Sequence, residues 1–92
     1  MKLKHRDIAK FNRIFDAEGG YLLDFSDRTI TYFFDEELNI DIDDEQYKED
    51  GTSKAKRVRC LLQKVDADTV LRILDKLWLY KMSIDPDGST EN

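Results

Sequence analysis

Apolar residues recur at intervals of three and four positions in four separate stretches of the chain. Such spacing places side chains on one face of an α-helix. The stretches begin near residues 5, 26, 53 and 66, and the first reaches about residue 18, where two glycines end it. Their apolar positions are, in order, Ile8, Phe11, Ile14 and Phe15; Ile30, Phe33, Phe34 and Leu38; Ala55, Val58, Leu61, Leu62 and Val65; and Val70, Leu71, Ile73, Leu74, Leu77, Trp78, Tyr80 and Met82.

Short polar side chains stand before three of these stretches, where they can accept hydrogen bonds from the free N–H groups of a first helical turn. The candidate N-caps are Ser26 or Asp27, Thr52 or Ser53, and Asp66 or Asp68. Residues 21–25 form an apolar connector, and residues 39–51 form a polar loop with room for one short helical turn. Its large apolar anchors are Ile40, Ile42 and Tyr47. The pattern predicts an all-α fold, a compact bundle of about four helices with an irregular acidic loop between the second and third main helices.

The last helix, which runs to about Met82, is apolar over more than one face. Such a helix either occupies the centre of the core or leaves an apolar patch for a partner. Both interpretations stay open, and the candidate apolar interface consists of Leu71, Trp78 and Tyr80. Residues 83–92 have the composition of a linker. We therefore expect one helical domain over residues 1–82, followed by a flexible tail or linker over 83–92.

Length and composition narrow the class of protein. A chain of 92 residues buries only about 60 to 65 % of its unfolded surface, which leaves little material for a deep catalytic cleft. Cys60 is the one cysteine, so no intramolecular disulfide forms and a reducing compartment fits best. The polar N-terminus lacks a secretory signal, and no apolar run approaches the roughly 20 residues that span a bilayer. The sequence predicts a cytoplasmic protein without a membrane segment.

Charge is strongly segregated along the chain, although the net charge is only −5. Residues 53–64 carry five basic side chains and no acidic one, whereas residues 35–50 carry nine acidic side chains against one lysine. One interpretation is that the basic helix docks on the acidic loop. Another is that it serves a partner, because a helix N-terminus beside basic side chains can hold an anion. The candidate partner or anion-binding surface is Thr52, Ser53, Lys54, Lys56 and Arg57.

The sequence does not match the residue spacings that are typical of catalytic sites or metal-binding sites. The only histidine, His5, lies in a polar first turn. We do not expect it to act as the base that activates a serine, cysteine or threonine nucleophile. The acidic stretch from residue 41 has Gln46 where a calcium loop needs glycine, and Thr52 where it needs glutamate. Cys60 is expected to be a small buried apolar residue. We expect no catalytic residue, no metal, no cofactor and no enzymatic activity.

Three segments stand in an order that resembles a known bacterial module. They are residues 20–29 (GYLLDFSDRT), residues 41–43 (DID) with Tyr47, and residues 51–57 (GTSKAKR). In this order the chain resembles, over roughly residues 10–80, the short N-terminal domain of AbiJ-type abortive-infection proteins of bacterial phage defence. The resemblance implies a helical accessory module that senses, recruits or couples, while another domain or protein delivers toxicity. It implies no catalytic role and assigns no function to single residues.

The leading hypothesis is a non-catalytic interaction domain of a bacterial antiviral-defence protein, accessory to an effector or associated with it. It would act through contacts with a protein partner, a neighbouring domain or a second copy. The alternative is a nucleic-acid-binding regulatory domain that uses the basic helix 53–64 to contact phosphates. Tyr21 and Tyr32 could stack on bases, but we expect both to be partly buried.

Overall fold

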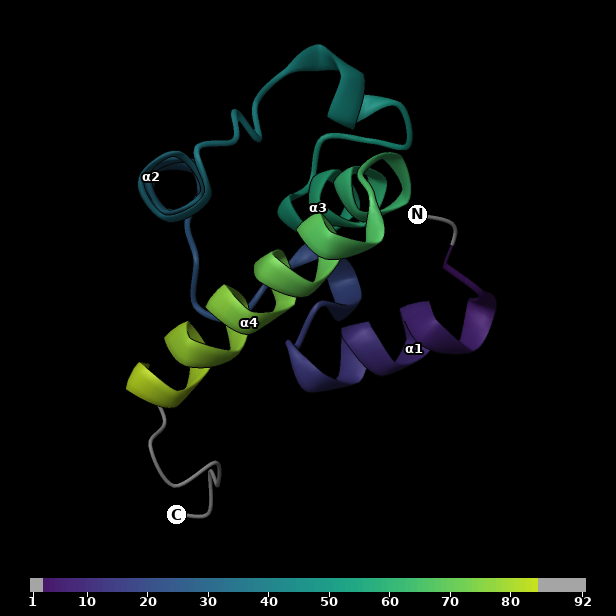
Figure 1. Ribbon diagram of the computed structural model, residues 1–92, viewed down its shortest axis with the longest axis horizontal. Helices are drawn as coiled ribbons and strands as arrows, with labels where there is room; N and C mark the ends of the chain where they lie inside the picture. Colours follow the sequence, from purple (N-terminus) through teal and green to yellow (C-terminus); the bar gives the residue numbers. More distant parts are fainter. Residues whose placement is uncertain (1–2, 85–92) are drawn as a thin grey trace.

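A computed structural model describes residues 3–84 of the chain. Within that range the chain forms four α-helices and two short 3-10 helices, without any strand (Figure 1). The elements are α1 (His5–Ile14), η1 (Glu18–Gly20), α2 (Asp27–Leu38), η2 (Glu45–Lys48), α3 (Lys54–Lys64) and α4 (Ala67–Ile84). The prediction of an all-α bundle of about four helices is confirmed.

Helix α1 ends earlier than the sequence predicted, at Ile14 rather than near residue 18. Asp16 takes a left-handed backbone conformation with φ 50°, and Gly19 follows with φ 73°. Left-handed residues end a helix and reverse the chain. As a result Phe15 and Ala17 both turn into the core. The periodic apolar pattern could not show this break, because Phe15 points inward whether or not the helix continues.

The predicted caps are present at the starts of α2 and α3. The backbone N–H of Thr29 donates to Ser26 Oγ over 3.1 Å, and the Ser26 N–H donates to Thr29 Oγ1 over 2.8 Å. At α3, Ser53 Oγ accepts from the Lys56 N–H over 3.2 Å. Each cap satisfies a backbone donor that the helix itself leaves free.

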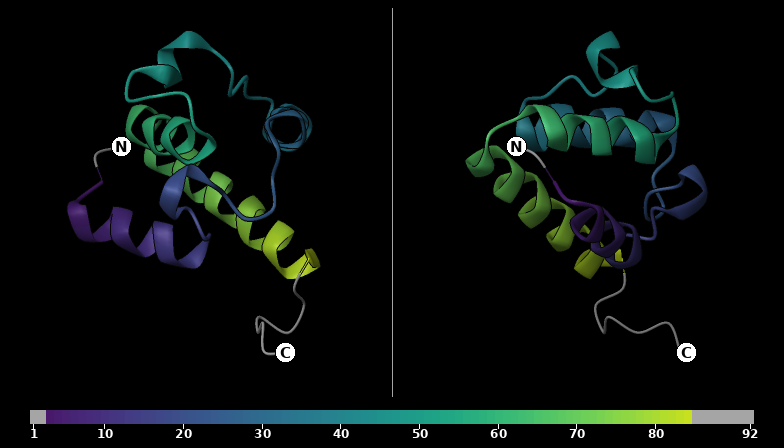
Figure 2. Two further views of the ribbon diagram at one scale, coloured as in Figure 1. Left: turned by 180° about the vertical axis from the view of Figure 1, so that it is seen from behind. Right: turned by 90° about the vertical axis from the view of Figure 1, so that its right-hand side faces the viewer.

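Helix α4, with 18 residues, is the longest helix in the part of the chain that the structure describes. It crosses the molecule diagonally, with α1 and α2 on opposite sides of it (Figures 1 and 2). Before it begins, Asp66 Oδ1 accepts from the Thr69 N–H over 2.9 Å, and its final residue, Ile84, lies two positions beyond the predicted end. Its buried face meets the buried faces of α2 and α3 in one core. The fully buried large side chains are Phe34, Leu22, Ile30, Ile42, Leu61, Leu62, Ile73, Leu77 and Val58.

The acidic loop between α2 and α3 is ordered and irregular, as predicted, and it holds the single helical turn η2. Ile42 is fully buried, and Ile40 and Tyr47 pack against the core from its edge. Cys60 is buried as expected, and its Sγ lies 3.5 Å from the carbonyl oxygen of Gln46 in this loop. In the described part of the chain, no helix combines the length and the apolar character that crossing a membrane requires. The predicted tail lies outside the described residues except for its first two positions, which belong to α4.

Candidate functional site

The basic surface predicted at the start of α3 separates into a buried part and an exposed part. Arg57 is only 3 % exposed, so it does not belong to the open surface that the sequence suggested. Thr52 and Lys56 are exposed, whereas Ser53 and Lys54 are half-buried. The guanidinium of Arg57 is therefore not accessible to a partner.

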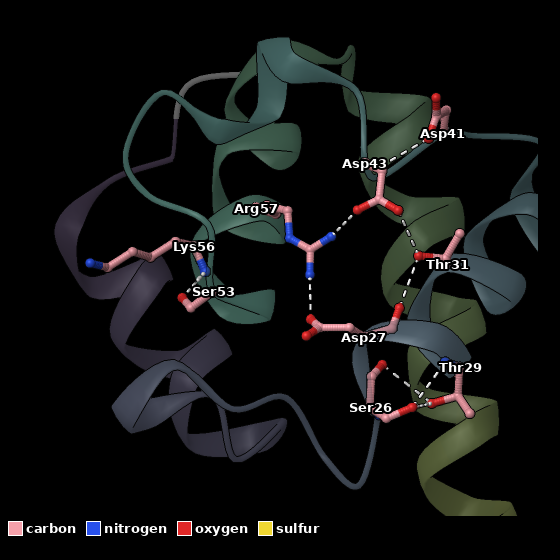
Figure 3. Close-up of polar contacts among 9 residues, drawn as sticks. All are labelled: Ser26, Asp27, Thr29, Thr31, Asp41, Asp43, Ser53, Lys56 and Arg57. Carbon is pink, nitrogen blue, oxygen red and sulfur yellow. Dashed lines mark hydrogen bonds and ion pairs between the residues drawn. The ribbon is translucent and has the colours of Figure 1, made fainter.

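Arg57 is held by two carboxylates that come from different parts of the chain (Figure 3). Its Nη1 lies 2.5 Å from Asp43 Oδ1 in the loop, and its Nη2 lies 2.9 Å from Asp27 Oδ1 in the first turn of α2. Thr31 Oγ1 donates to the other oxygen of Asp43 over 3.0 Å. The guanidinium thus joins α2, the acidic loop and α3. We call Arg57, Asp27, Asp43 and Thr31 the Arg57 network.

The Arg57 network is asymmetric in its exposure to water. The guanidinium is buried, but the side chain of Asp43 is 51 % exposed and that of Asp27 is 81 % exposed. Arg57 Nε is buried and has no hydrogen-bond partner in the part of the chain that the structure describes. Charge-assisted hydrogen bonds from the guanidinium terminus are strong enough to offset such a deficit. The network is a structural clamp whose acidic side faces solvent.

All three segments that carry the family resemblance converge on this network. Residues 20–29 contribute the cap of α2 and Asp27, residues 41–43 contribute Asp43, and residues 51–57 contribute the cap of α3 and Arg57. These residues cap α2 and α3 and form the ion pairs of Arg57, so they stabilise the fold.

Other basic residues of α3 also bind within the molecule. Arg59 Nη1 donates to Asn12 Oδ1 over 2.8 Å, which ties α3 to α1. Lys64 Nζ pairs with Glu49 Oε2 over 3.0 Å, and this hydrogen bond raises the pKa of Lys64. Together with the Arg57–Asp43 pair, the Lys64–Glu49 pair confirms the interpretation that the basic helix docks on the acidic loop.

The sequence Gly51-Thr52-Ser53-Lys54 also has a structural explanation. Gly51 has φ 139°, and a Cβ atom at this position would lie 2.6 Å from Cδ of Lys56. The loop therefore passes directly beneath the Lys56 stem, where only glycine fits without a shift. Lys54 Nζ lies 5.6 Å from the centre of the Tyr21 ring, a distance at which a cation is attracted to the ring face.

The positions of the described side chains also bear on metal binding. No group of three or more His, Cys, Asp or Glu side chains within this range could hold a metal ion. His5 is exposed in the first turn of α1.

An apolar groove of about 640 Å³ lies between α1 and α4. We call it the α1–α4 groove. Both helices lie below α2 and α3 in the two views of Figure 2, apart from the start of α4. Near one end of the groove, Lys81 Nζ donates to the carbonyl oxygen of Ile14 over 2.7 Å and ties the two helices together. The lining residues are Leu3, Asp7, Lys10, Phe11, Ile14, Phe15, Leu62, Ala67, Val70, Leu71, Leu74, Asp75 and Trp78.

Two of the three residues predicted as an apolar interface line this groove. Leu71 is 64 % exposed and Trp78 is 45 % exposed. Ile14, which the helical pattern placed in the core, is 40 % exposed and lines the same groove. The sequence did not reveal the contribution of α1, because its apolar stripe serves both the core and the groove.

Tyr80, the third predicted residue, lies on a different edge of α4. Its ring stacks on that of Phe25 with a centroid distance of 4.2 Å, and its hydroxyl donates to Asp24 Oδ1 over 2.5 Å. Burial, reinforced by the hydrogen bond to Asp24, raises the pKa of Tyr80 to about 12. One edge of α4 is therefore covered by the chain itself, while the edge with Leu71 and Trp78 is open.

Comparison of the chain with protein-family models, with curated proteins and with solved structures finds no match. The candidate site consists of an apolar floor between two helices, with exposed apolar side chains on the walls.

Proposed function

We propose that this chain is a non-catalytic interaction domain that binds another protein through the α1–α4 groove. The observation that carries the proposal is the exposure of Leu71 and Trp78 beside an apolar floor. Covering apolar surface is favourable by roughly 25 cal/mol per Å², and contiguous apolar patches on small domains mark interaction sites. A protein partner can supply the missing cover.

The shape of the groove favours a helical occupant. Two helices that stand apart over an apolar floor leave the position that a third helix takes in a bundle. The lining residues of α4 extend from Ala67 to Trp78, which corresponds to about three helical turns. An occupant of similar length would present apolar residues at the helical spacing of three and four positions.

We further propose that the domain works in bacterial antiviral defence, as a cytoplasmic module accessory to an effector or associated with it. The support is the resemblance to the N-terminal domain of AbiJ-type abortive-infection proteins over roughly residues 10–80. In such a role, occupation of the groove would recruit or couple the part of the system that delivers toxicity.

Nucleic-acid binding through α3 has less support than protein binding. Arg57, Arg59 and Lys64 bind partners within the molecule, which leaves Lys54 and Lys56 as the cations nearest to the start of the helix. Both tyrosines that were expected to be partly buried are exposed, but Tyr21 already lies beneath Lys54. A gel-retardation assay at low salt checks this alternative, since binding to nucleic acid that Lys56→Glu abolishes would favour it.

Photo-crosslinking in cells tests the main proposal. A photoreactive phenylalanine analogue replaces Leu71 in the groove or, as a matched control, Leu79, which is 54 % exposed on the same helix and does not line the groove. We expect a discrete protein adduct at position 71 and none at position 79. Equal labelling at both positions, or no adduct at either, would contradict the proposal.

A further inference from the structure

The side of α1 that faces away from the core carries a row of basic side chains. Arg6, Lys10 and Arg13 follow one another at spacings of four and three positions, which place residues along one side of a helix. All three side chains are exposed, whereas Phe11 on the opposite side is buried. Every ion pair in the range 3–84 joins residues outside α1, so none of the three is paired there. We call these three residues the α1 basic stripe.

Two cations of neighbouring helices reach α1 and are bound there by uncharged groups. Arg59 Nη1 of α3 donates to Asn12 Oδ1 over 2.8 Å, and Lys81 Nζ of α4 donates to the carbonyl oxygen of Ile14 over 2.7 Å. Among the side chains that the structure describes, neither cation has a carboxylate within ion-pair distance. The cations of α3 that face the acidic loop, by contrast, are paired with carboxylates. The positive charge around α1 is therefore not neutralised by ion pairs of this kind.

Acidic side chains border the α1 basic stripe without pairing with it. Asp7 of α1 and Asp75 of α4 line the α1–α4 groove together with Lys10, and Asp7 Oδ2 accepts from the Lys4 N–H over 3.0 Å at the start of the helix. Asp16 lies beyond the last residue of α1. Residues 3–16 carry four basic and two acidic side chains with the histidine neutral, so the segment keeps a positive net charge.

The negative charge of the chain is concentrated away from α1. Residues 35–50 have a net charge of −8, so the remaining residues have a net charge of +3 within the total of −5. The acidic loop and α1 lie at opposite ends of the molecule in every ribbon view, with α3 between them (Figures 1 and 2). This separation gives the molecule an electrostatic dipole whose positive end is at α1. Such a field orients an approaching polyanion towards α1, although the net charge of the chain is negative.

From this arrangement we propose that the α1 basic stripe binds the phosphate backbone of a nucleic-acid duplex without reading its base sequence. The stripe rises by about 10 Å along the helix, a length over which one DNA strand carries about three phosphates. Two of its three residues are arginines, whose planar guanidinium matches the oxygens of a phosphate. The one phenylalanine of α1 is buried, so the stripe lacks the exposed aromatic ring on which single-stranded bases stack. The inference goes beyond the proposed function, since it assigns a different partner to a different side of α1.

A membrane surface fits the stripe less well than a nucleic acid does. An amphipathic helix binds a membrane by burying its apolar face among the lipids. The apolar face of α1 is already used in the core, where Phe11 and Phe15 are buried. Ile14, the exposed apolar residue of α1, lines the groove and does not belong to the stripe. The charges of the stripe are thus suited to phosphates that are reached through water, as those of a duplex are.

Fluorescence anisotropy of a short labelled DNA duplex measures the binding at several salt concentrations. Three phosphate contacts predict a dissociation constant on the order of 100 micromolar at physiological salt, and a slope of about −2.7 for the logarithm of the binding constant against that of the salt concentration. Arg6→Gln removes one contact and should make the slope smaller by about one. A duplex of unrelated sequence should bind equally well, because phosphate contacts carry no sequence information.

Charge reversal at matched positions separates the stripe from the net charge of the chain. Arg6→Glu combined with Arg13→Glu should weaken binding at low salt by about 30-fold or more, because two attractive contacts become repulsive. The control combines Arg28→Glu and Arg72→Glu. Both control residues are exposed, lie outside α1 and form no ion pair in the range 3–84. The net charge changes equally, and the control should bind within about 3-fold of the wild type. Circular dichroism and urea midpoints establish that both double variants are folded.

Four results would overturn the inference. They are no binding of the duplex even at low salt, equal losses in the two double variants, binding that Lys56→Glu abolishes and the α1 variant does not, and tighter binding to vesicles containing phosphatidylserine than to the duplex. The third result would place the site on α3, and the fourth would replace the nucleic acid by a membrane. None of them changes the crosslinking expected at position 71, so the proposed function stands or fails separately.

Discussion

The Arg57 network and the α1–α4 groove differ in what they bury and what they expose. In the network, a charged group lies inside the molecule, and the chain itself supplies two carboxylates to accept its hydrogen bonds. In the groove, apolar side chains remain largely in contact with water: Leu71 is 64 % exposed and Trp78 is 45 % exposed, although Lys81 Nζ lies 5.4 Å from the centre of the Trp78 ring. A buried charge must be satisfied before the chain can fold, whereas an exposed apolar side chain costs little in the isolated domain. Substitutions in the two regions should therefore affect different measurements, folding in the first and association in the second.

Arg57→Met should have the largest effect on folding. The substitution keeps much of the side-chain volume but removes the guanidinium that joins three segments. Because Asp27 and Asp43 remain in contact with water, the cost should lie at the lower end of the range for broken buried pairs, about 2–4 kcal/mol. Urea denaturation followed by circular dichroism measures it. Arg59→Met on the same helix is the control, with an expected loss of about 1 kcal/mol, and equal losses would contradict a special role for Arg57.

The two carboxylates of the network should not be equivalent. Asp43 is the less exposed partner and also accepts from Thr31, whereas Asp27 is mostly exposed. We expect Asp43→Ala to lower the free energy of unfolding by about 1–2 kcal/mol and Asp27→Ala by less than about 1 kcal/mol. Urea midpoints of the two variants, combined with those of the double variants that include Arg57→Met, give the two coupling energies. A larger coupling for Asp27 would reverse the proposed asymmetry.

The fold was largely predictable because local signals and burial agree along most of the chain. Ser26 and Ser53 cap the helices that their positions predicted, and the spacing from Ile30 to Leu38 matches the buried face of α2. The end of α1 was missed, because it depends on the left-handed residue Asp16, which carries no periodic signal. The acid–base docking was predicted as one of two alternatives, since charge segregation shows that partners exist without showing which residues pair.

The candidate site was less predictable than the fold, for a physical reason. Spacing along a helix identifies an apolar face, but only the packing of other helices decides how much of that face is covered. Leu71 and Tyr80 stand nine positions apart, which places them on opposite sides of α4. Tyr80 is covered by Phe25 and held by Asp24, whereas Leu71 is mostly exposed. Arg57 illustrates the converse, because a cation in a basic stretch is expected at the surface until two carboxylates from distant segments enclose it.

The covered edge of α4 should respond to alkaline pH. The pKa of Tyr80 is raised from 10.0 to about 12 in the folded chain. A raised pKa means that the contribution of Tyr80 to stability is fully present below pH 10 and is lost as the pH rises towards 12. Tyr80→Phe keeps the stacked ring but lacks the hydroxyl, and should cost about 1 kcal/mol at neutral pH. The difference in urea stability between the two proteins should shrink between pH 10 and 12, and a constant difference would exclude the hydroxyl as its source.

Substitution of Leu71 in the groove should have the smallest effect on the free energy of unfolding, although we expect it to weaken partner binding. Leu71→Ser removes apolar surface that the isolated domain leaves in water, so the free energy of unfolding of the monomer should change by no more than about 0.5 kcal/mol. The urea midpoint of the variant should stay at its wild-type value. A large loss of stability would mean that Leu71 supports the core of its own chain.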